Sequence, residues 1–177
     1  MNDPVIGADK RGGEKVSFQE RLLGQWFHFC GGVVISPAFI LTAAHCVEGG
    51  DFTSPAGLRV MAGERDLTTE EGTEQLGTIN LIIEHPFYDP ITYENDIALL
   101  RLETPLMDTE FVKSVSLPSP FQNFTGESCR VSGWGRIQED GASSDLLLYT
   151  DLTIINDTQC ITAYTHDELF PSMLCAG

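Results

Sequence analysis

The 177-residue sequence predicts an all-β protein, built as a barrel or a sandwich. Short segments rich in β-branched and aromatic residues alternate with Gly, Pro, Asn and Asp, which is the pattern of strands joined by turns. Signals for helices are few, and no internal repeat is visible. An apolar content of 42% indicates a globular protein with a core. Many short strands at this spacing are typical of barrels and sandwiches.

Eight segments carry the strand pattern. In chain order they are Val16–Gln19, Phe27–Ser36, Phe39–Thr42, Leu58–Met61, Leu76–Glu84, Ile97–Leu102, Ser128–Ser132 and Leu146–Ile155. Ile97–Leu102 is almost continuously apolar, which predicts a strand buried on both faces. We expect Asn156 or Asp157 to cap a short helix that runs through Tyr164, because a side-chain oxygen there accepts the first free backbone N–H groups.

The stretch between Leu102 and Phe121 predicts a connection between two β units. It contains Pro105, Pro118 and Pro120. Proline cannot donate to a central sheet ladder, so this clustering argues against a continuous strand. The alternative is a long surface loop within one barrel.

The charge of the chain excludes one class of partner. Twenty-six acidic residues against ten basic ones give a net charge of −16, which would repel nucleic acid and other polyanions. The charge serves either solubility alone or the attraction of basic substrates. No window approaches the ~18 continuous apolar residues of a membrane span, so we expect no membrane insertion. Met1–Pro4 shows no signal peptide, and we expect the natural N-terminus to be missing.

Cysteines and sequons point to an oxidising compartment. The count of five cysteines is odd, and no two of them have the C-x-x-C spacing of a zinc site. Asn123-Phe124-Thr125 and Asn156-Asp157-Thr158 are sequons, so Asn123 and Asn156 are candidate glycosylation sites. Together these features predict a secreted, extracellular protein.

Three motifs follow one another along the chain. They are Thr42-Ala43-Ala44-His45-Cys46, Asn95-Asp96-Ile97-Ala98-Leu99-Leu100 and Ser132-Gly133-Trp134-Gly135. In this order, after His28-Phe29-Cys30-Gly31-Gly32, they closely resemble the chymotrypsin–trypsin family of serine proteases. The resemblance runs from about Val5 to Gly177 and looks most like the digestive trypsins of arthropods. It implies two six-stranded antiparallel β-barrels, the second of them incomplete in this chain.

The resemblance assigns His45 and Asp96 to a catalytic triad. A serine hydroxyl is a weak nucleophile at neutral pH, so an imidazole must take its proton as it attacks the scissile carbonyl. A buried carboxylate fixes the tautomer of that imidazole and stabilises the imidazolium. His45 and Asp96 match the first two members in the family's order of His, Asp and Ser. The other histidines, His28, His85 and His166, lack such motifs and are expected to be structural or solvent-facing.

The third member of the triad is absent from these 177 residues. In the family the nucleophilic serine lies in Gly-Asp-Ser-Gly-Gly, shortly after the segment that Met173–Gly177 matches, and no serine here has that flanking. The resemblance pairs Cys30 with Cys46 and Cys160 with Cys175. It leaves Cys129 unpaired, because its family partner lies further along. We therefore expect the chain to be a fragment that is inactive alone.

Two further assignments come from the resemblance. The stretch from Gly63 to Glu74 has the spacing of the family's calcium loop, with candidate ligands Glu64, Asp66, Thr69, Glu71 and Glu74. Carboxylates and the carbonyls of Asp66 and Thr69 would supply the oxygens that a hard cation prefers. The alternative is a solvated acidic loop. Val5 resembles the N-terminus that zymogen cleavage exposes, although Pro4 replaces the usual Arg or Lys.

The sequence thus predicts one peptidase domain, with a first barrel at about 5–104, a connection at 105–120 and a partial second barrel at 121–177. The expected function is that of a trypsin-like serine endopeptidase that cleaves proteins or peptides. We expect protein protease inhibitors to bind it and the full-length protein to be monomeric. No cofactor is expected for the chemistry itself, and calcium would be structural. The alternatives are a non-catalytic homologue that acts as an adaptor or binding protein, and a short secreted β-protein that binds a partner through its exposed half-barrel.

Overall fold

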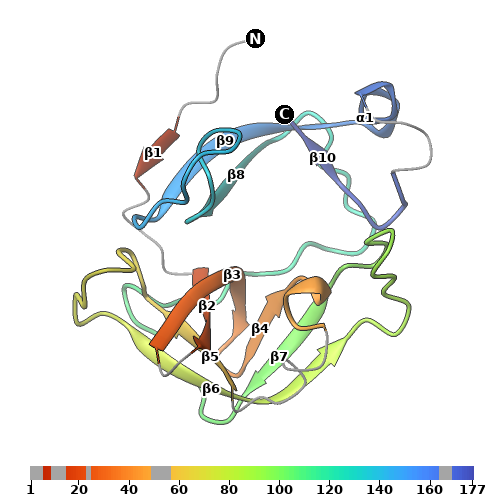
Figure 1. The fold of residues 1–177 in the computed structure, drawn as a ribbon. Helices are drawn as coiled ribbons and strands as arrows, with labels where there is room; N and C mark the ends of the chain where they lie inside the picture. Colours follow the sequence, from red (N-terminus) through yellow and green to blue (C-terminus); the bar gives the residue numbers. More distant parts are fainter. Residues whose placement is uncertain (1–5, 9–14, 23–24, 49–56, 164–168) are drawn as a thin grey trace.

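The computed structural model describes residues 6–8, 15–22, 25–48, 57–163 and 169–177 (Figure 1). Val5 and His166 lie outside these ranges. The strands are β1 (Ile6–Ala8), β2 (Lys15–Leu22), β3 (Gln25–Ser36), β4 (Phe39–Thr42), β5 (Leu58–Ala62), β6 (Gln75–Glu84), β7 (Ala98–Leu102), β8 (Ser128–Gly133), β9 (Leu148–Ile155) and β10 (Cys175–Ala176). The 3-10 helix η1 (Ala44–Cys46) and the α-helix α1 (Asp157–Ala163) complete the described elements.

Strands β2 to β7 form a closed antiparallel barrel in the order β2-β3-β4-β7-β6-β5. Its interior is filled by aliphatic side chains, among them the fully buried Val16, Val34, Ile40, Val60 and Leu100. These positions come from every second residue of their strands, as in β5, where Leu58, Val60 and Ala62 are buried and the residues between them are more exposed. Closure leaves no unpaired edge in this unit.

Strand β7 differs from its prediction. Its buried residues are Ala98, Leu100 and Leu102, whereas Arg101 is exposed and Leu99 is half-buried. Ile97, which was expected inside the strand, lies before it and is exposed. The prediction of burial on both faces was therefore wrong. A barrel strand has only one face toward the core, and the apolar run does not distinguish this from a strand covered on both sides.

The second unit is a partial sheet centred on β9. Strand β9 is paired with β1, β8 and β10, all antiparallel. Ile6–Ala8 thus belongs to the second unit, although the first barrel was predicted to begin at about residue 5 and in fact begins with β2. Figure 1 shows β1, β8, β9 and β10 above the closed barrel. The prediction of an all-β fold with one complete barrel and one partial β unit is confirmed.

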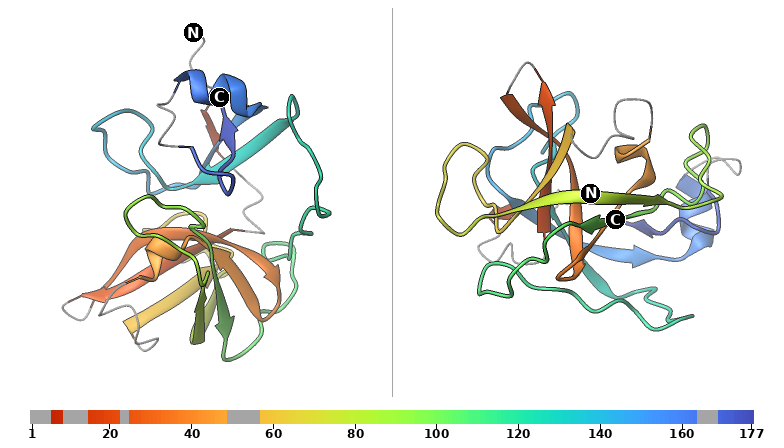
Figure 2. Two further views of the ribbon diagram at one scale, coloured as in Figure 1. Left: turned by 90° about the vertical axis from the view of Figure 1, so that its right-hand side faces the viewer. Right: turned by 90° about the horizontal axis from the view of Figure 1, so that it is seen from below.

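The two units are joined by more than the chain that links them. The connection from 103 to 127 carries no strand, as the prolines predicted. Backbone hydrogen bonds from Leu67 to the Asp145 carbonyl (2.9 Å) and from Leu147 to the Arg65 carbonyl (2.8 Å) tie a loop of the barrel to the segment before β9. The left view of Figure 2 shows the second unit facing one end of the barrel.

The helices are short and local. Asn156 caps α1, because its Oδ1 accepts a hydrogen bond from the Gln159 backbone N–H at 2.9 Å, so one of the two predicted caps is correct. The seven residues of α1 are the longest helix in the described part of the chain, which is far too short to cross a membrane.

The core of the barrel makes a prediction about stability. Leu100→Ala should lower the free energy of unfolding by about 2–5 kcal/mol, because it removes a buried side chain and leaves a cavity. The matched control is Leu76→Ala on β6, where the side chain is 59% exposed and the expected change is within about 0.5 kcal/mol. Urea unfolding curves measure both, and equal losses in the two variants would contradict this placement of the core.

Candidate functional site

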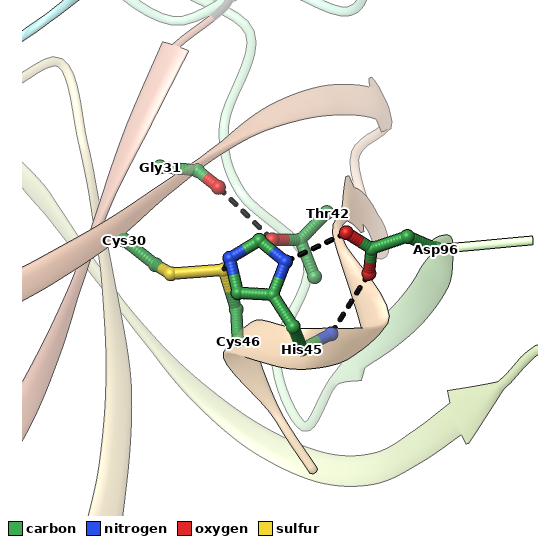
Figure 3. Close-up of a disulfide and its surroundings, with 6 residues drawn as sticks. All are labelled: Cys30, Gly31, Thr42, His45, Cys46 and Asp96. Atoms are coloured by element: carbon green, nitrogen blue, oxygen red, sulfur yellow. Dashed lines mark hydrogen bonds and ion pairs between the residues drawn. A yellow bond between two sulfur atoms is a disulfide. The ribbon is translucent and has the colours of Figure 1, made fainter. Parts of the chain in front are cut away.

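His45 and Asp96 meet at one end of the barrel (Figure 3). The His45 Nδ1 atom lies 2.7 Å from Asp96 Oδ2, and the His45 backbone N–H donates to Asp96 Oδ1 at 2.9 Å. A carboxylate only accepts hydrogen bonds, so Nδ1 carries the proton in the neutral ring and Nε2 is left as an acceptor. The side chain of His45 is 47% exposed and that of Asp96 is 21% exposed. Nearly half of the His45 side chain is therefore open to a substrate or another side chain.

The pairing of β4 with β7 brings these two residues together. Thr42, the last residue of β4, pairs with Ala98, the first residue of β7. His45 follows within η1, where the Val47 and Glu48 N–H groups donate to the Ala44 carbonyl. On the other side, Asn95 has a φ of 57°, a conformation that Asn tolerates better than most residues. Both turns leave the barrel at the same end and direct their side chains toward each other.

A disulfide braces the turn that carries His45. Cys30 on β3 is bonded to Cys46 in η1, as the resemblance predicted. The Thr42 hydroxyl donates to the Gly31 carbonyl at 2.9 Å and joins the same two strands. Closing a loop of this length contributes about 3 kcal/mol on the chain-entropy model. The disulfide lies on the side of the His45 ring opposite Asp96 (Figure 3), with Cys46 Sγ 3.5 Å from Nε2.

A cavity of about 600 Å³ opens between the two units beside this pair. Its walls come from β2, β3 and β4 of the barrel, from Asp96, and from the Ser132–Gly135 segment of the second unit. His28 is part of the wall, and its Nδ1 lies 2.7 Å from the buried Ser17 hydroxyl. The edge of its ring meets Trp134 at a centroid distance of 5.3 Å. His28 is therefore a structural residue, in agreement with its prediction.

Tyr93 was missed by the sequence analysis. Its ring meets the His45 ring edge to face at a centroid distance of 5.8 Å, and its side chain is otherwise largely exposed. The backbone φ of Tyr93 is 59°, an unusual value for an aromatic residue. No pattern in the sequence signals such a conformation. The 85–97 loop thus adds an aromatic wall to the site as well as the carboxylate of Asp96.

The acidic loop from Gly63 to Glu74 is folded back on itself. Glu71 forms an ion pair with Arg65, and Glu74 accepts hydrogen bonds from the N–H groups of Glu71 and Gly72, each at 2.7 Å. The Asp66 carbonyl accepts the Thr69 N–H, and its carboxylate accepts the Thr68 N–H and hydroxyl. A Cβ on Gly63 would lie 2.4 Å from the Thr73 carbonyl, so only glycine fits at the base of this loop.

Glu64 is the buried member of this loop. It is 7% exposed. Burial, followed by the negative charges of Glu74, Asp66 and Glu71, raises the pKa of Glu64 to about 7, against which the Arg59 guanidinium acts in the opposite direction. The three predicted carboxylates, those of Glu64, Glu71 and Glu74, therefore interact electrostatically, although Glu71 and Glu74 are engaged within the loop.

The remaining predicted residues lie apart from the site. Cys160 and Cys175 form the second predicted disulfide, and Cys129 on β8 is a partly buried free thiol. Asn123 is exposed, and its side-chain oxygen accepts the Thr125 N–H at 2.9 Å. Asn156 is exposed at the start of α1. Within the described residues, both sequon asparagines are therefore exposed to solvent.

Comparisons with known proteins agree with this architecture. The Trypsin family model matches residues 5–177. The chain is 40% identical to Trypsin-1 of Astacus astacus, over 98% of this chain and 74% of that protein. It is 34% identical to Trypsin-3 of Salmo salar, over 99% and 70% of the two chains, and 33% identical to Serine protease 1 of Rattus norvegicus, over 99% and 68%. The chain belongs to the trypsin family.

Membership in the trypsin family defines the chemistry to which the site belongs. The protein is a trypsin-like serine endopeptidase, and its substrates are proteins or peptides. Nothing in the comparisons favours the non-catalytic homologue over the enzyme. Among the residues that the structure describes, no serine hydroxyl is hydrogen-bonded to His45; Ser17 faces His28 and Ser172 accepts the Asn95 N–H.

The half-buried position of His28 predicts how stability depends on pH. Burial lowers the pKa of His28 below its ordinary value of 6.5, because the charged form is poorly solvated there. The neutral ring therefore stabilises the fold above pH 6.5, and this contribution is lost as the pH falls through the pKa of the folded state. We expect the free energy of unfolding to decrease over that range in the natural chain and to decrease less in His28→Gln. Urea titrations at several pH values measure both slopes, and identical slopes would contradict the assignment.

Proposed function

We propose that His45 is the general base of the endopeptidase and that Asp96 orients it. The supporting observation is the pair of hydrogen bonds between them. One fixes the ring tautomer through Nδ1, and the other holds the backbone of His45 on the same carboxylate. This leaves Nε2 unprotonated on a side chain that is 47% exposed, and an unprotonated nitrogen is what a proton acceptor needs.

The reaction would proceed in two halves. The Nε2 atom of His45 takes the proton of a serine hydroxyl while the serine oxygen bonds to the scissile carbonyl carbon, and the imidazolium then gives that proton to the leaving amine. A water molecule afterwards releases the acyl group by the same transfer. Asp96 stabilises the imidazolium in both halves. The family resemblance places the serine and the oxyanion-hole amides in a Gly-Asp-Ser-Gly-Gly motif, which residues 1–177 do not contain.

We further propose a secreted enzyme that prefers basic substrates. The net charge of −16 attracts cationic segments of a polypeptide and repels acidic ones. Two disulfides and two exposed sequons suit an oxidising, extracellular compartment. Cleavage after Arg or Lys and inhibition by protein protease inhibitors are expected on the family resemblance.

The acidic loop is proposed to hold a structural calcium ion. Its donor set consists of oxygens only, as calcium requires, and Glu64 is a buried carboxylate placed among three other carboxylates. Ligands are expected from the side chains of Glu64, Glu71 and Glu74 and from the carbonyls of Asp66 and Thr69. To bind the ion, Glu71 would exchange its ion pair with Arg65 for the metal. Calcium would supply positive charge that lets Glu64 remain ionised.

The catalytic assignment predicts how two substitutions, at His45 and at Asp96, change the activity. In a protein that joins residues 1–177 to a segment with Gly-Asp-Ser-Gly-Gly, His45→Ala should abolish turnover of peptide substrates. Asp96→Asn should leave the fold intact and lower kcat by about 10⁴, the magnitude known for this substitution in serine proteases of this type. Glu110→Gln is the control, because Glu110 is an exposed carboxylate in the connection between the units and its substitution should leave kcat unchanged. Initial rates measure all three, and unchanged activity in either site variant would exclude the assignment.

The calcium assignment predicts a linked dependence on pH. Without metal, the raised pKa of Glu64 means that the neutral carboxyl stabilises the fold below pH 4.5, and this stability is lost as the pH rises to about 7. The loss is on the order of 3 kcal/mol. Calcium should restore stability near pH 7 and raise the melting temperature there, since it binds the folded state.

This measurement has two kinds of control, which are a chelator that removes calcium and substitutions inside and outside the loop. Glu64→Gln should flatten the pH dependence measured in a chelator, and Glu74→Gln should weaken the response to calcium. Glu110→Gln, an exposed residue outside the loop, should change neither. Melting curves that ignore millimolar calcium in the natural chain would identify a solvated acidic loop instead.

A further inference from the structure

Outside the pair of His45 and Asp96, a further hydrogen bond joins the two segments that carry this pair. The Tyr88 hydroxyl donates to Glu48 Oε2 at 2.9 Å, across a sequence separation of 40 residues. Tyr88 belongs to the 85–97 loop, which carries Asp96, and Glu48 follows η1, which carries His45. The bond therefore ties the carrier of the carboxylate to the carrier of the imidazole at a second point.

Both ends of this bond are fixed to the barrel. The Tyr88 ring packs against the hydrophobic core. The Glu48 backbone N–H donates to the Ala44 carbonyl at 3.0 Å, so Glu48 is held in the same turn as His45. Tyr88 and Glu48 are both partly buried, and a hydrogen bond is stronger in such surroundings than between groups in open water. The link is therefore built to hold the two segments together.

The Tyr88 hydroxyl lies among negative charges. Burial, followed by the hydrogen bond to Glu48 and the charges of Glu48 and Asp96, raises the pKa of Tyr88 above its ordinary value of 10. The hydroxyl therefore keeps its proton throughout the neutral range and remains a donor. A carboxylate only accepts hydrogen bonds, so Tyr88 supplies what Glu48 needs, and a hydrogen bond to a charged acceptor is of the stronger kind.

The path from Tyr88 to Asp96 is short and is closed by backbone hydrogen bonds. The Tyr88 N–H donates to the His85 carbonyl, and the His85 N–H donates to the Ile97 carbonyl, each at 3.0 Å. Ile97 follows Asp96 directly in the chain. A shift of Tyr88 would therefore move the backbone beside Asp96, and with it the carboxylate that accepts the His45 Nδ1–H.

We propose that Tyr88 and Glu48 are positioning residues of the endopeptidase reaction. Their hydrogen bond holds the loop of Asp96 against the turn of His45, and it keeps Nδ1–H aligned on the carboxylate while Nε2 gains and loses its proton. The effect on catalysis rests on the proposed function, whereas the alignment of Nδ1–H does not. Neither Tyr88 nor Glu48 lines the 600 Å³ cavity, so both act through His45 and Asp96.

The first experiment measures catalysis in the protein that also carries the Gly-Asp-Ser-Gly-Gly motif. Tyr88→Phe keeps the packed ring and removes the hydroxyl. We expect kcat to fall by about 10-fold, less than the roughly 10²-fold that a misplacement of about 1 Å costs. KM should change by less than about 2-fold, because the alignment acts on the transition state. Tyr149→Phe is the matched control and should leave kcat unchanged, since the Tyr149 ring lies under Arg130 in the second unit.

The second experiment determines whether the two residues act through one bond. Glu48→Ala should lower kcat as much as Tyr88→Phe does, and the double variant should lose no more than either alone, because each change removes the same interaction. Glu48→Gln should retain most of the activity, since its amide oxygen still accepts from the hydroxyl. Glu48→Gln as impaired as Glu48→Ala, or losses that multiply in the double variant, would overturn the hydrogen bond as the cause.

The third experiment needs no serine and uses the natural chain of 177 residues. The proton that His45 Nδ1 donates to Asp96 gives a low-field NMR resonance, which is assigned by its loss in His45→Ala. In Tyr88→Phe this proton should exchange with water about 10-fold faster, within the factor that one hydrogen bond to a charged group is worth. Tyr149→Phe should leave the rate unchanged. Circular dichroism establishes that each variant is folded at the temperature used, so a general loss of stability would not change this rate.

The activity and the exchange rate together separate this inference from the proposed function. If kcat and the exchange rate are both unchanged in Tyr88→Phe while His45→Ala abolishes turnover, the positioning role is wrong and the role of His45 stands. If exchange becomes faster in Tyr88→Phe but His45→Ala retains turnover, the alignment is supported and the proposed function is wrong. A rise in KM at constant kcat would identify Tyr88 as a substrate-binding residue and would also overturn the positioning role.

Discussion

The register between β4 and β7 is the constraint on which the site depends. Thr42 at the end of β4 pairs with Ala98 at the start of β7. His45, three residues after Thr42, and Asp96, two residues before Ala98, therefore lie at the same end of the barrel. A slip of one residue would move the side chains of β7 to the opposite face and expose Leu100. Burial of Leu100 and Ile40 therefore fixes the distance between His45 and Asp96 as firmly as any contact within the site. Core packing and catalytic geometry are consequences of one alignment.

The sequence predicted what depends on local pattern or on a shared motif. Runs of β-branched and aromatic residues between turn residues located the strands of the barrel within a few residues, and the resemblance carried by the motifs identified His45, Asp96 and both disulfides. It missed β1 and β10, of three and two residues, because they exist only through pairing with β9. It also missed the contact of Tyr93 with His45. Tyr93 has a positive φ, and the residue types in this loop do not predict that conformation. The misreading of Ile97–Leu102 has a similar cause, since apolar content says nothing about which neighbour covers each face.

The second unit contributes to the site by closing its back wall. Trp134 is buried, its indole N–H donates to the Arg65 carbonyl at 3.3 Å, and the edge of its ring meets His28. The Arg65 carbonyl also accepts the Leu147 N–H. Arg65 lies between Glu64 and Asp66, within the acidic loop. A change in that loop thus acts directly on two hydrogen bonds that hold the units together. The acidic loop is a structural joint between the units as well as a candidate ion site.

The surroundings of His45 hold its ring from two sides. Asp96 keeps the proton on Nδ1 and leaves Nε2 with a free lone pair, which is what a proton acceptor requires. Joined in a disulfide, Cys30 and Cys46 brace η1, the turn that carries His45. The carboxylate therefore fixes the tautomer of the ring, and the disulfide fixes the backbone from which the ring extends.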